Sequence, residues 1–111
     1  MQKVIFINAG HHLTDSGKIT PYGNESEINR LIRDELIFEL VRQEFEVYAV
    51  PDALDLKKSV EWVNERAKTL DSGLAIDIHC NCCGNTGAES YYAAHSVKSR
   101  ELAVKLINAY C

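Results

Sequence analysis

Hydrophobic residues along the chain form short continuous runs and longer periodic ones, a pattern typical of strands that alternate with helices. Three short runs, 3–8 (KVIFIN), 46–50 (EVYAV) and 74–79 (LAIDIH), are predicted to be strands. The first is rich in β-branched residues and almost wholly apolar, as expected for a strand that is buried on both faces. A fourth strand is predicted over 89–94 (ESYYAA).

Between these runs, apolar residues recur at the spacing of one helix face over 24–45, 55–70 and 96–110. The first residue of each segment, Asn24, Asp55 or Ser96, is of a type that caps helix N-termini. Glu27 completes a capping-box pattern in the first helix. The buried side of that helix is predicted to carry Ile28, Leu31, Ile32, Leu36, Ile37, Leu40, Val41 and Phe45.

The resulting order β-α-β-α-β-β-α predicts an α/β fold with a mostly parallel sheet flanked by helices. The sequence contains no linker, repeat or low-complexity tract. With 111 residues, we expect one domain that spans 1–111.

Composition narrows the function classes. The chain is 46% hydrophobic and 25% charged, with a net charge of −4 and interspersed signs. No basic stripe favours nucleic acid or an anionic membrane as partner. No apolar run is long enough to span a bilayer, and the first residues lack the apolar core of a signal peptide. We therefore expect synthesis in the cytoplasm.

The cysteines are clustered, because Cys80, Cys82 and Cys83 fall within four positions, whereas Cys111 stands apart. This spacing is poor for a disulfide framework and favours reduced thiols. A thiolate metal site or a Cys–His nucleophile pair is an alternative that lacks a supporting motif.

Three metal-competent side chains converge by topology alone. His11 follows the first predicted strand, His79 ends the third, and Glu25 opens the first helix, so all lie at the carboxyl edge of the sheet. Glu25 also continues the apolar stripe of its helix, where a cation would compensate a buried carboxylate. Two histidines and one glutamate form a common catalytic zinc set. Surface histidines and a helix-end glutamate are the simpler alternative.

Four motifs in order, VIFINAGH, GNESEIN, IDIHCN and GAESYY, resemble the zinc-dependent N-acetylmuramoyl-L-alanine amidases of the amidase 3 type, which include cell-separation and spore amidases and phage endolysins. The similarity runs from Lys3 to about Tyr110. It implies that His11, Glu25 and His79 bind Zn²⁺. It also implies hydrolysis of the amide between N-acetylmuramic acid and L-alanine, with peptidoglycan or a muropeptide as partner and the cell wall as site of action.

The sequence departs from the family pattern near the ligands. Asn8 stands where the family has an aspartate, His12 replaces a glycine, and Asp77 stands where serine is common. Loss of the charge at Asn8 would weaken the orientation of a ligand.

The family's general base is a second glutamate on a strand beyond the last helix, and no residue here matches it. We therefore expect either a fragment of a longer enzyme or a natural short form with weak or no catalysis. Glu89 is a weak candidate substitute for the base, because a structural role or a contact at the rim of the site fits it better. Asn81 and Tyr91 are candidates for substrate contacts.

A second function class is a catalytically inactive module that binds cell-wall peptide or a protein partner, and a third is another zinc-dependent peptidase or amidohydrolase. An exposed sheet edge would also invite pairing with a second copy of the chain.

Overall fold

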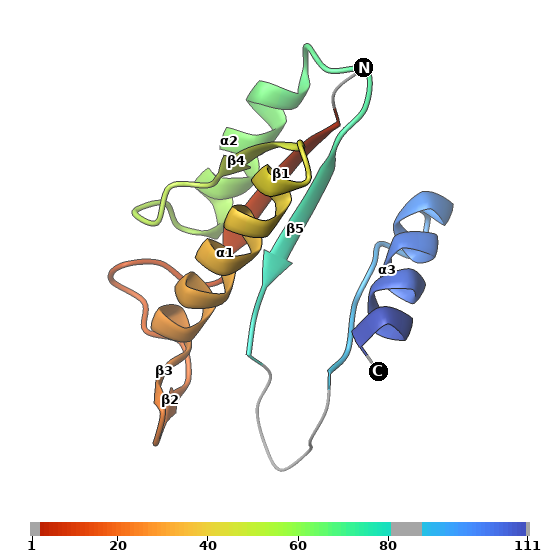
Figure 1. Ribbon diagram of the computed structural model, residues 1–111. Helices are drawn as coiled ribbons and strands as arrows, with labels where there is room; N and C mark the ends of the chain where they lie inside the picture. Colours follow the sequence, from red (N-terminus) through yellow and green to blue (C-terminus); the bar gives the residue numbers. More distant parts are fainter. Residues whose placement is uncertain (1–2, 81–87, 111) are drawn as a thin grey trace. The chain divides into compact units, whose positions relative to one another are not determined.

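The computed structural model describes residues 3–80 and 88–110 (Figure 1). Contacts divide the chain into two compact units, Met1–Asn81 and Cys82–Cys111. The first unit holds the sheet and two long helices, and the second holds one helix. That residues 1–111 form one domain stays a prediction.

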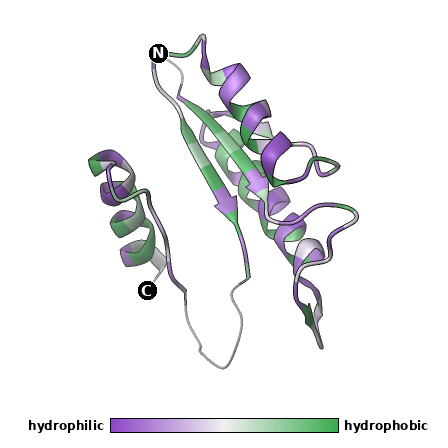
Figure 2. Ribbon diagram, turned by 180° about the vertical axis from the view of Figure 1, so that it is seen from behind, coloured by the Kyte–Doolittle hydropathy of each residue, from purple (hydrophilic) through white to green (hydrophobic). Residues whose placement is uncertain are grey.

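A three-stranded parallel sheet with the order β4-β1-β5 forms the first unit. Its strands are β1 (Val4–Ala9), β4 (Glu46–Ala49) and β5 (Leu74–Ile78). Burial of β1 is nearly complete, with Ile7 fully inaccessible, as predicted for a strand covered on both faces. Strands β1 and β5 are hydrophobic over most of their length, and each carries one polar residue near its carboxyl end (Figure 2). The predicted α/β class with a parallel sheet is confirmed.

Helices α1 (Glu25–Arg42) and α2 (Leu56–Ala67) connect the three strands. Because β4 and β5 lie on opposite sides of β1, right-handed crossovers place the two helices on opposite faces of the sheet (Figure 1). On the α2 side, Trp62 packs edge-on against Phe6 of β1, with 6.3 Å between the ring centres.

The predicted N-caps of these helices are confirmed. The side chain of Asn24 accepts a 3.0 Å hydrogen bond from the backbone N–H of Glu27, and its amide donates back to the Glu27 carboxylate. The side chain of Asp55 accepts from the backbone N–H of Lys58 at 2.9 Å. Local sequence signals therefore determine where both helices begin.

The buried side of α1 differs from the prediction. Leu31, Ile32 and Val41 are exposed, whereas Asn29 and Arg33 are buried. The guanidinium of Arg33 forms ion pairs with Asp34 and Asp52. Both polar side chains tolerate burial because they find partners outside the helix: Asn29 donates to the carbonyl of Gly10, and Arg33 pairs with Asp52.

The predicted fourth strand over 89–94 is wrong, since these residues form no strand. A segment becomes a strand only where a neighbouring strand pairs with its backbone, and the described parallel sheet consists of β4, β1 and β5. Instead Ser90 donates its hydroxyl hydrogen bond to the carbonyl of Ala103, 2.8 Å away in α3 (Val97–Tyr110). Ser96 caps α3 as predicted, because its hydroxyl accepts from the N–H of Ser99 at 3.2 Å.

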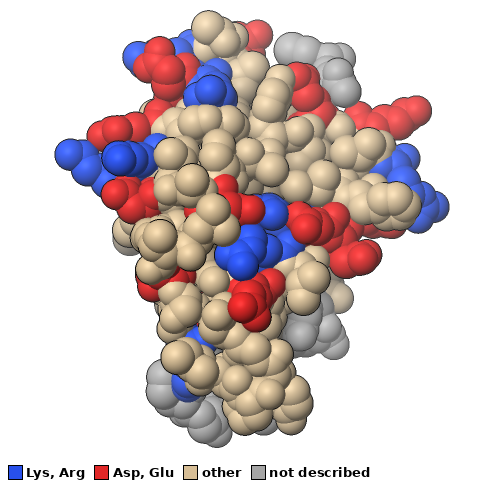
Figure 3. Space-filling view, turned by 90° about the vertical axis from the view of Figure 1, so that its left-hand side faces the viewer, with Lys and Arg blue, Asp and Glu red and all other residues tan. Residues whose placement is uncertain are grey.

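A short hairpin of β2 (Ile19–Thr20) and β3 (Gly23–Asn24) precedes α1 and was not predicted. Two-residue strands are too short to produce an alternating pattern. On the face of the molecule in Figure 3, acidic and basic side chains are interspersed. No helix among the described residues combines the length and apolarity that crossing a membrane requires.

Glu44 follows α1 with a φ of 68°, in the left-handed region that disfavours side chains. The N–H of Phe45 returns to the carbonyl of Leu40 and that of Glu44 to Val41, which is a Schellman ending. We predict that Glu44→Gly stabilises the chain by about 0.5–1 kcal/mol. Urea unfolding measures this, and an unchanged or lower midpoint contradicts it.

Candidate metal centre

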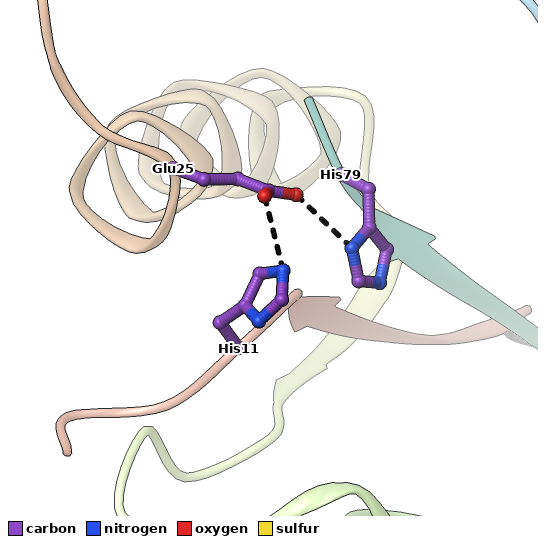
Figure 4. A group of neighbouring side chains, drawn as sticks. All are labelled: His11, Glu25 and His79. Carbon is purple, nitrogen blue, oxygen red and sulfur yellow. Dashed lines mark hydrogen bonds and ion pairs between the residues drawn. The ribbon is translucent and has the colours of Figure 1, made fainter. Parts of the chain in front are cut away.

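The structure brings together the three side chains that topology predicted to converge. Glu25 is the first residue of α1, His11 lies two residues beyond β1, and His79 directly follows β5. One ligand atom from each lies within 4.8 Å of the others. Figure 4 shows the Glu25 carboxylate facing both imidazole rings.

The Glu25 carboxylate is the centre of this group, and its side chain is only 6% exposed. One oxygen lies 3.0 Å from Nε2 of His11 and accepts from the backbone N–H of Lys18 at 3.1 Å. The other lies 3.2 Å from Nδ1 of His79 and accepts from the N–H of Cys80 at 3.1 Å. The carboxylate thereby joins both histidine segments to the start of α1.

The net pKa shift of Glu25 is downward. Burial alone would raise its pKa, but the N–H of Lys18, the charge of His11 and the N–H of Cys80 outweigh that effect. The positive end of the helix dipole also favours a negative charge at this position. Glu25 is therefore ionised at neutral pH.

Each imidazole ring lies between two carboxylates. Nδ1 of His11 is 2.8 Å from Asp15, opposite Glu25, and Nε2 of His79 is 3.0 Å from Asp77, again opposite Glu25. A neutral imidazole carries one N–H and can donate to only one of its two carboxylates. The other nitrogen then turns a lone pair toward a carboxylate oxygen.

The repulsion between the nitrogen lone pair and the carboxylate oxygen is removed if the ring gains a second proton. It is also removed if a metal cation lies between Glu25 and the rings. The pKa of His11 is raised, first by its hydrogen bond to Asp15 and further by the charge of Glu25, although burial opposes both. Two imidazoles and one carboxylate are also the donor set that zinc accepts. The residues present therefore fit a zinc ion.

The backbone turns sharply to aim His11 at this point. His11 has a φ of 66°, a left-handed conformation that costs of order 1 kcal/mol and is concentrated at functional sites. The turn is held because the buried Asn29 amide donates to the carbonyl of Gly10 at 3.1 Å. The N–H of Gly10 in turn donates to the carbonyl of Ile78 at 2.7 Å.

Two glycines leave the space that the rings occupy. A Cβ on Gly10 would lie 2.4 Å from the His79 ring, and one on Gly17 would lie 2.5 Å from the His11 ring and 2.8 Å from Glu25. Gly17 also has a φ of +63°, which disfavours any side chain. Glycine at both positions is thus a steric requirement of the group.

The sequence did not point to Asp15 or Asn29 as parts of this group. Asp15 is four residues from His11 in an irregular loop, and only the turn of that loop brings the two together. The departures at Asn8 and Asp77 prove to be joined, because the Asn8 amide donates to Asp77 at 2.9 Å. His12, the third departure, is paired with the hydroxyl of Thr14 at 3.0 Å.

The cysteine cluster is described only at Cys80. Its thiol is free and donates to the side-chain oxygen of Asn29 at 3.4 Å. Burial and the charge of Glu25 raise its pKa, which disfavours a thiolate ligand at this residue. Cys82, Cys83 and the predicted substrate contact Asn81 lie outside the described residues.

Glu89 and Tyr91 belong to the second unit. A hydrogen bond to Glu89 raises the pKa of Tyr91, a residue that is 80% exposed. Their roles as general base and substrate contact stay predictions.

Comparison with protein families gives a match over nearly the whole chain. The family model described as N-acetylmuramoyl-L-alanine amidase matches residues 5–110. No curated protein and no solved structure matches the chain significantly.

We predict that Gly10→Ala lowers zinc affinity by about tenfold or more, because the added methyl group drives the His79 ring away from Glu25. Gly73→Ala is the matched control, since its Cβ meets only ordinary contacts at 3.4 Å and beyond. Competition with a zinc chelator measures both. Equal affinities would contradict the steric role of Gly10.

For the metal-free chain we predict lower stability at pH 8.5 than at pH 5.5. The raised pKa of His11 gives stability that is complete below 6.5 and is lost as pH rises through the folded-state value. The lowered pKa of Glu25 gives stability that is present above 4.5 and is lost as pH falls through its folded-state value. Both contributions are therefore present near pH 5.5.

Thermal unfolding in the presence of a chelator tests this pH dependence. His11→Gln removes the titrating ring and should reduce the difference between the two pH values. The same difference in wild type and variant would show that other groups cause it.

Proposed function

The chain belongs to the N-acetylmuramoyl-L-alanine amidase family, and from this premise we propose that it hydrolyses the amide between N-acetylmuramic acid and L-alanine of peptidoglycan. The observation that carries the proposal is the buried Glu25 carboxylate, which faces one nitrogen of His11 and one of His79. Peptidoglycan or a muropeptide is the proposed partner, and the cell wall the proposed site of action.

We propose that His11, Glu25 and His79 hold a zinc ion. When bound, zinc supplies Lewis-acid activation of water and of the amide carbonyl. The chain's own contribution is to present three donor atoms together, with Glu25 fixed by two backbone N–H groups. Such fixation lowers the cost of assembling the site, because the ligands need little rearrangement.

The proposed hydrolysis also needs a general base. Asp15 and Asp77 are the carboxylates beside the histidines, but each is already bonded to a ring nitrogen, which suits orientation of a ligand better than proton transfer. We propose Glu89 as the base, a role that would require it to exchange its hydrogen bond to Tyr91 for one to water, and we propose Asn81 and Tyr91 as substrate contacts.

The second candidate function is a zinc-bound module that binds cell-wall peptide without cleaving it. The engagement of both Asp15 and Asp77 favours it, because a missing base would lower the rate by about 10² to 10⁴-fold. Two copies of the chain could pair through the outer edge of β4 or of β5, and such a dimer would fit either function.

Zinc content and muropeptide cleavage of the purified chain test the proposal. We expect one zinc per chain and release of the stem peptide by the wild type, with both lost in His79→Ala. His95→Ala is the matched control, since His95 is an exposed histidine of the second unit.

Zinc without cleavage in the wild type would favour the binding module. A wild type without zinc, or a His79→Ala variant that keeps it, would contradict the proposed metal centre.

A further inference from the structure

Asp77 lies on the opposite side of His79 from Glu25. One oxygen of Asp77 is 3.0 Å from Nε2 of His79, and the other accepts a 2.9 Å hydrogen bond from the side-chain amide of Asn8. Both oxygens of this carboxylate are thus engaged by named partners, one of them the histidine ring.

The sheet holds this arrangement in place. Asn8 and Asp77 are register partners on the adjacent parallel strands β1 and β5. His79 follows Asp77 by two residues, so both side chains leave the strand on the same side. The positions of Asn8 and Asp77 therefore follow from the strand pairing, and His79 is the first residue after that pairing ends.

The ring of His79 has two carboxylates competing for one proton. Glu25 faces Nδ1 at 3.2 Å, and Asp77 faces Nε2 at 3.0 Å. If the proton lay on Nδ1, it would point at Glu25 and occupy the nitrogen that the metal needs. A carboxylate is only an acceptor, so each of the two favours the tautomer whose N–H points at it. The Glu25 oxygen already accepts from the backbone N–H of Cys80 and lies farther from the ring, so Asp77 is the stronger acceptor and favours the proton on Nε2.

We propose that Asp77, held by Asn8, is a positioning residue that keeps the His79 ring proton on Nε2 and leaves the Nδ1 lone pair for zinc. This inference rests on the proposed function, because zinc is the ligand that the lone pair serves. Carboxylates that accept from a metal-binding histidine set its tautomer and orientation and raise its basicity. Asp15, held by the N–H of Gly17 at 3.1 Å, lies against His11 in the corresponding way.

The test uses Asp77→Asn, which retains the shape but introduces an amide that can donate to Nε2 and favour the wrong tautomer. Asp71→Asn is the matched control, because it removes the same charge from an exposed residue before β5. We expect zinc affinity, measured by chelator competition, to fall by about 10- to 100-fold in Asp77→Asn. The control should bind zinc as the wild type does.

A second readout needs no metal. In the chelator-treated chain at pH 8, nitrogen-15 NMR of the imidazoles should place the His79 ring proton on Nε2 in the wild type and on Nδ1 in Asp77→Asn. Asn8→Ala should move zinc affinity and ring signals in the same direction by a smaller amount. It also provides a test if Asp77→Asn fails to fold.

The outcomes separate this inference from the proposed function. Zinc binding by the wild type with equal affinity in Asp77→Asn would overturn the inference and leave the metal centre intact. A wild-type ring proton on Nδ1 would overturn it whether or not zinc binds. Failure of the wild type to bind zinc would contradict the proposed function, and with it the role of Asp77 toward the metal.

Discussion

The carboxylate of Glu25 is the constraint on which the rest of the site depends. It is buried at the N-terminus of α1 and contacts His11 and His79, which follow two different strands. A buried anion is tolerated only where donors or a cation compensate it. Two backbone N–H groups, the helix end and the two rings provide that compensation. They come from the loop after β1, from the start of α1 and from the two residues that follow β5. The chain that leaves β1 must therefore turn back toward α1, which explains the left-handed backbone of His11 and the glycines around it.

The pairing of the parallel strands β1 and β5 positions further side chains around the site. The register between β1 and β5 sets Asn8 beside Asp77, and Asp77 beside His79, so the sheet orients a side chain that lies beyond its edge. The two departures from the family pattern thus form one hydrogen-bonded pair: a carboxylate is absent at Asn8 and present at Asp77, its neighbour across the strands. A substitution that removes the polar group at either position would break this hydrogen bond.

How well the sequence predicted each feature depends on how far apart along the chain the interacting residues lie. The helix caps Asn24, Asp55 and Ser96 depend on residues three positions away, and all three were predictable. Convergence of His11, Glu25 and His79 followed from topology, because parallel strands end at one edge. The buried side of α1 was not predictable, since Asn29 and Arg33 find their partners in distant loops. Nor was the absence of a strand at 89–94, because a strand depends on its neighbour.

The central claim is that one zinc ion is held by two imidazoles and a carboxylate. X-ray absorption spectroscopy of the zinc-loaded chain tests this most directly, because it distinguishes nitrogen and oxygen ligands from sulfur by distance. The account predicts a first shell of nitrogen and oxygen at about 2.0–2.2 Å with the outer scattering of two imidazoles. A sulfur shell at about 2.3 Å would contradict it and would assign the metal to the cysteine cluster.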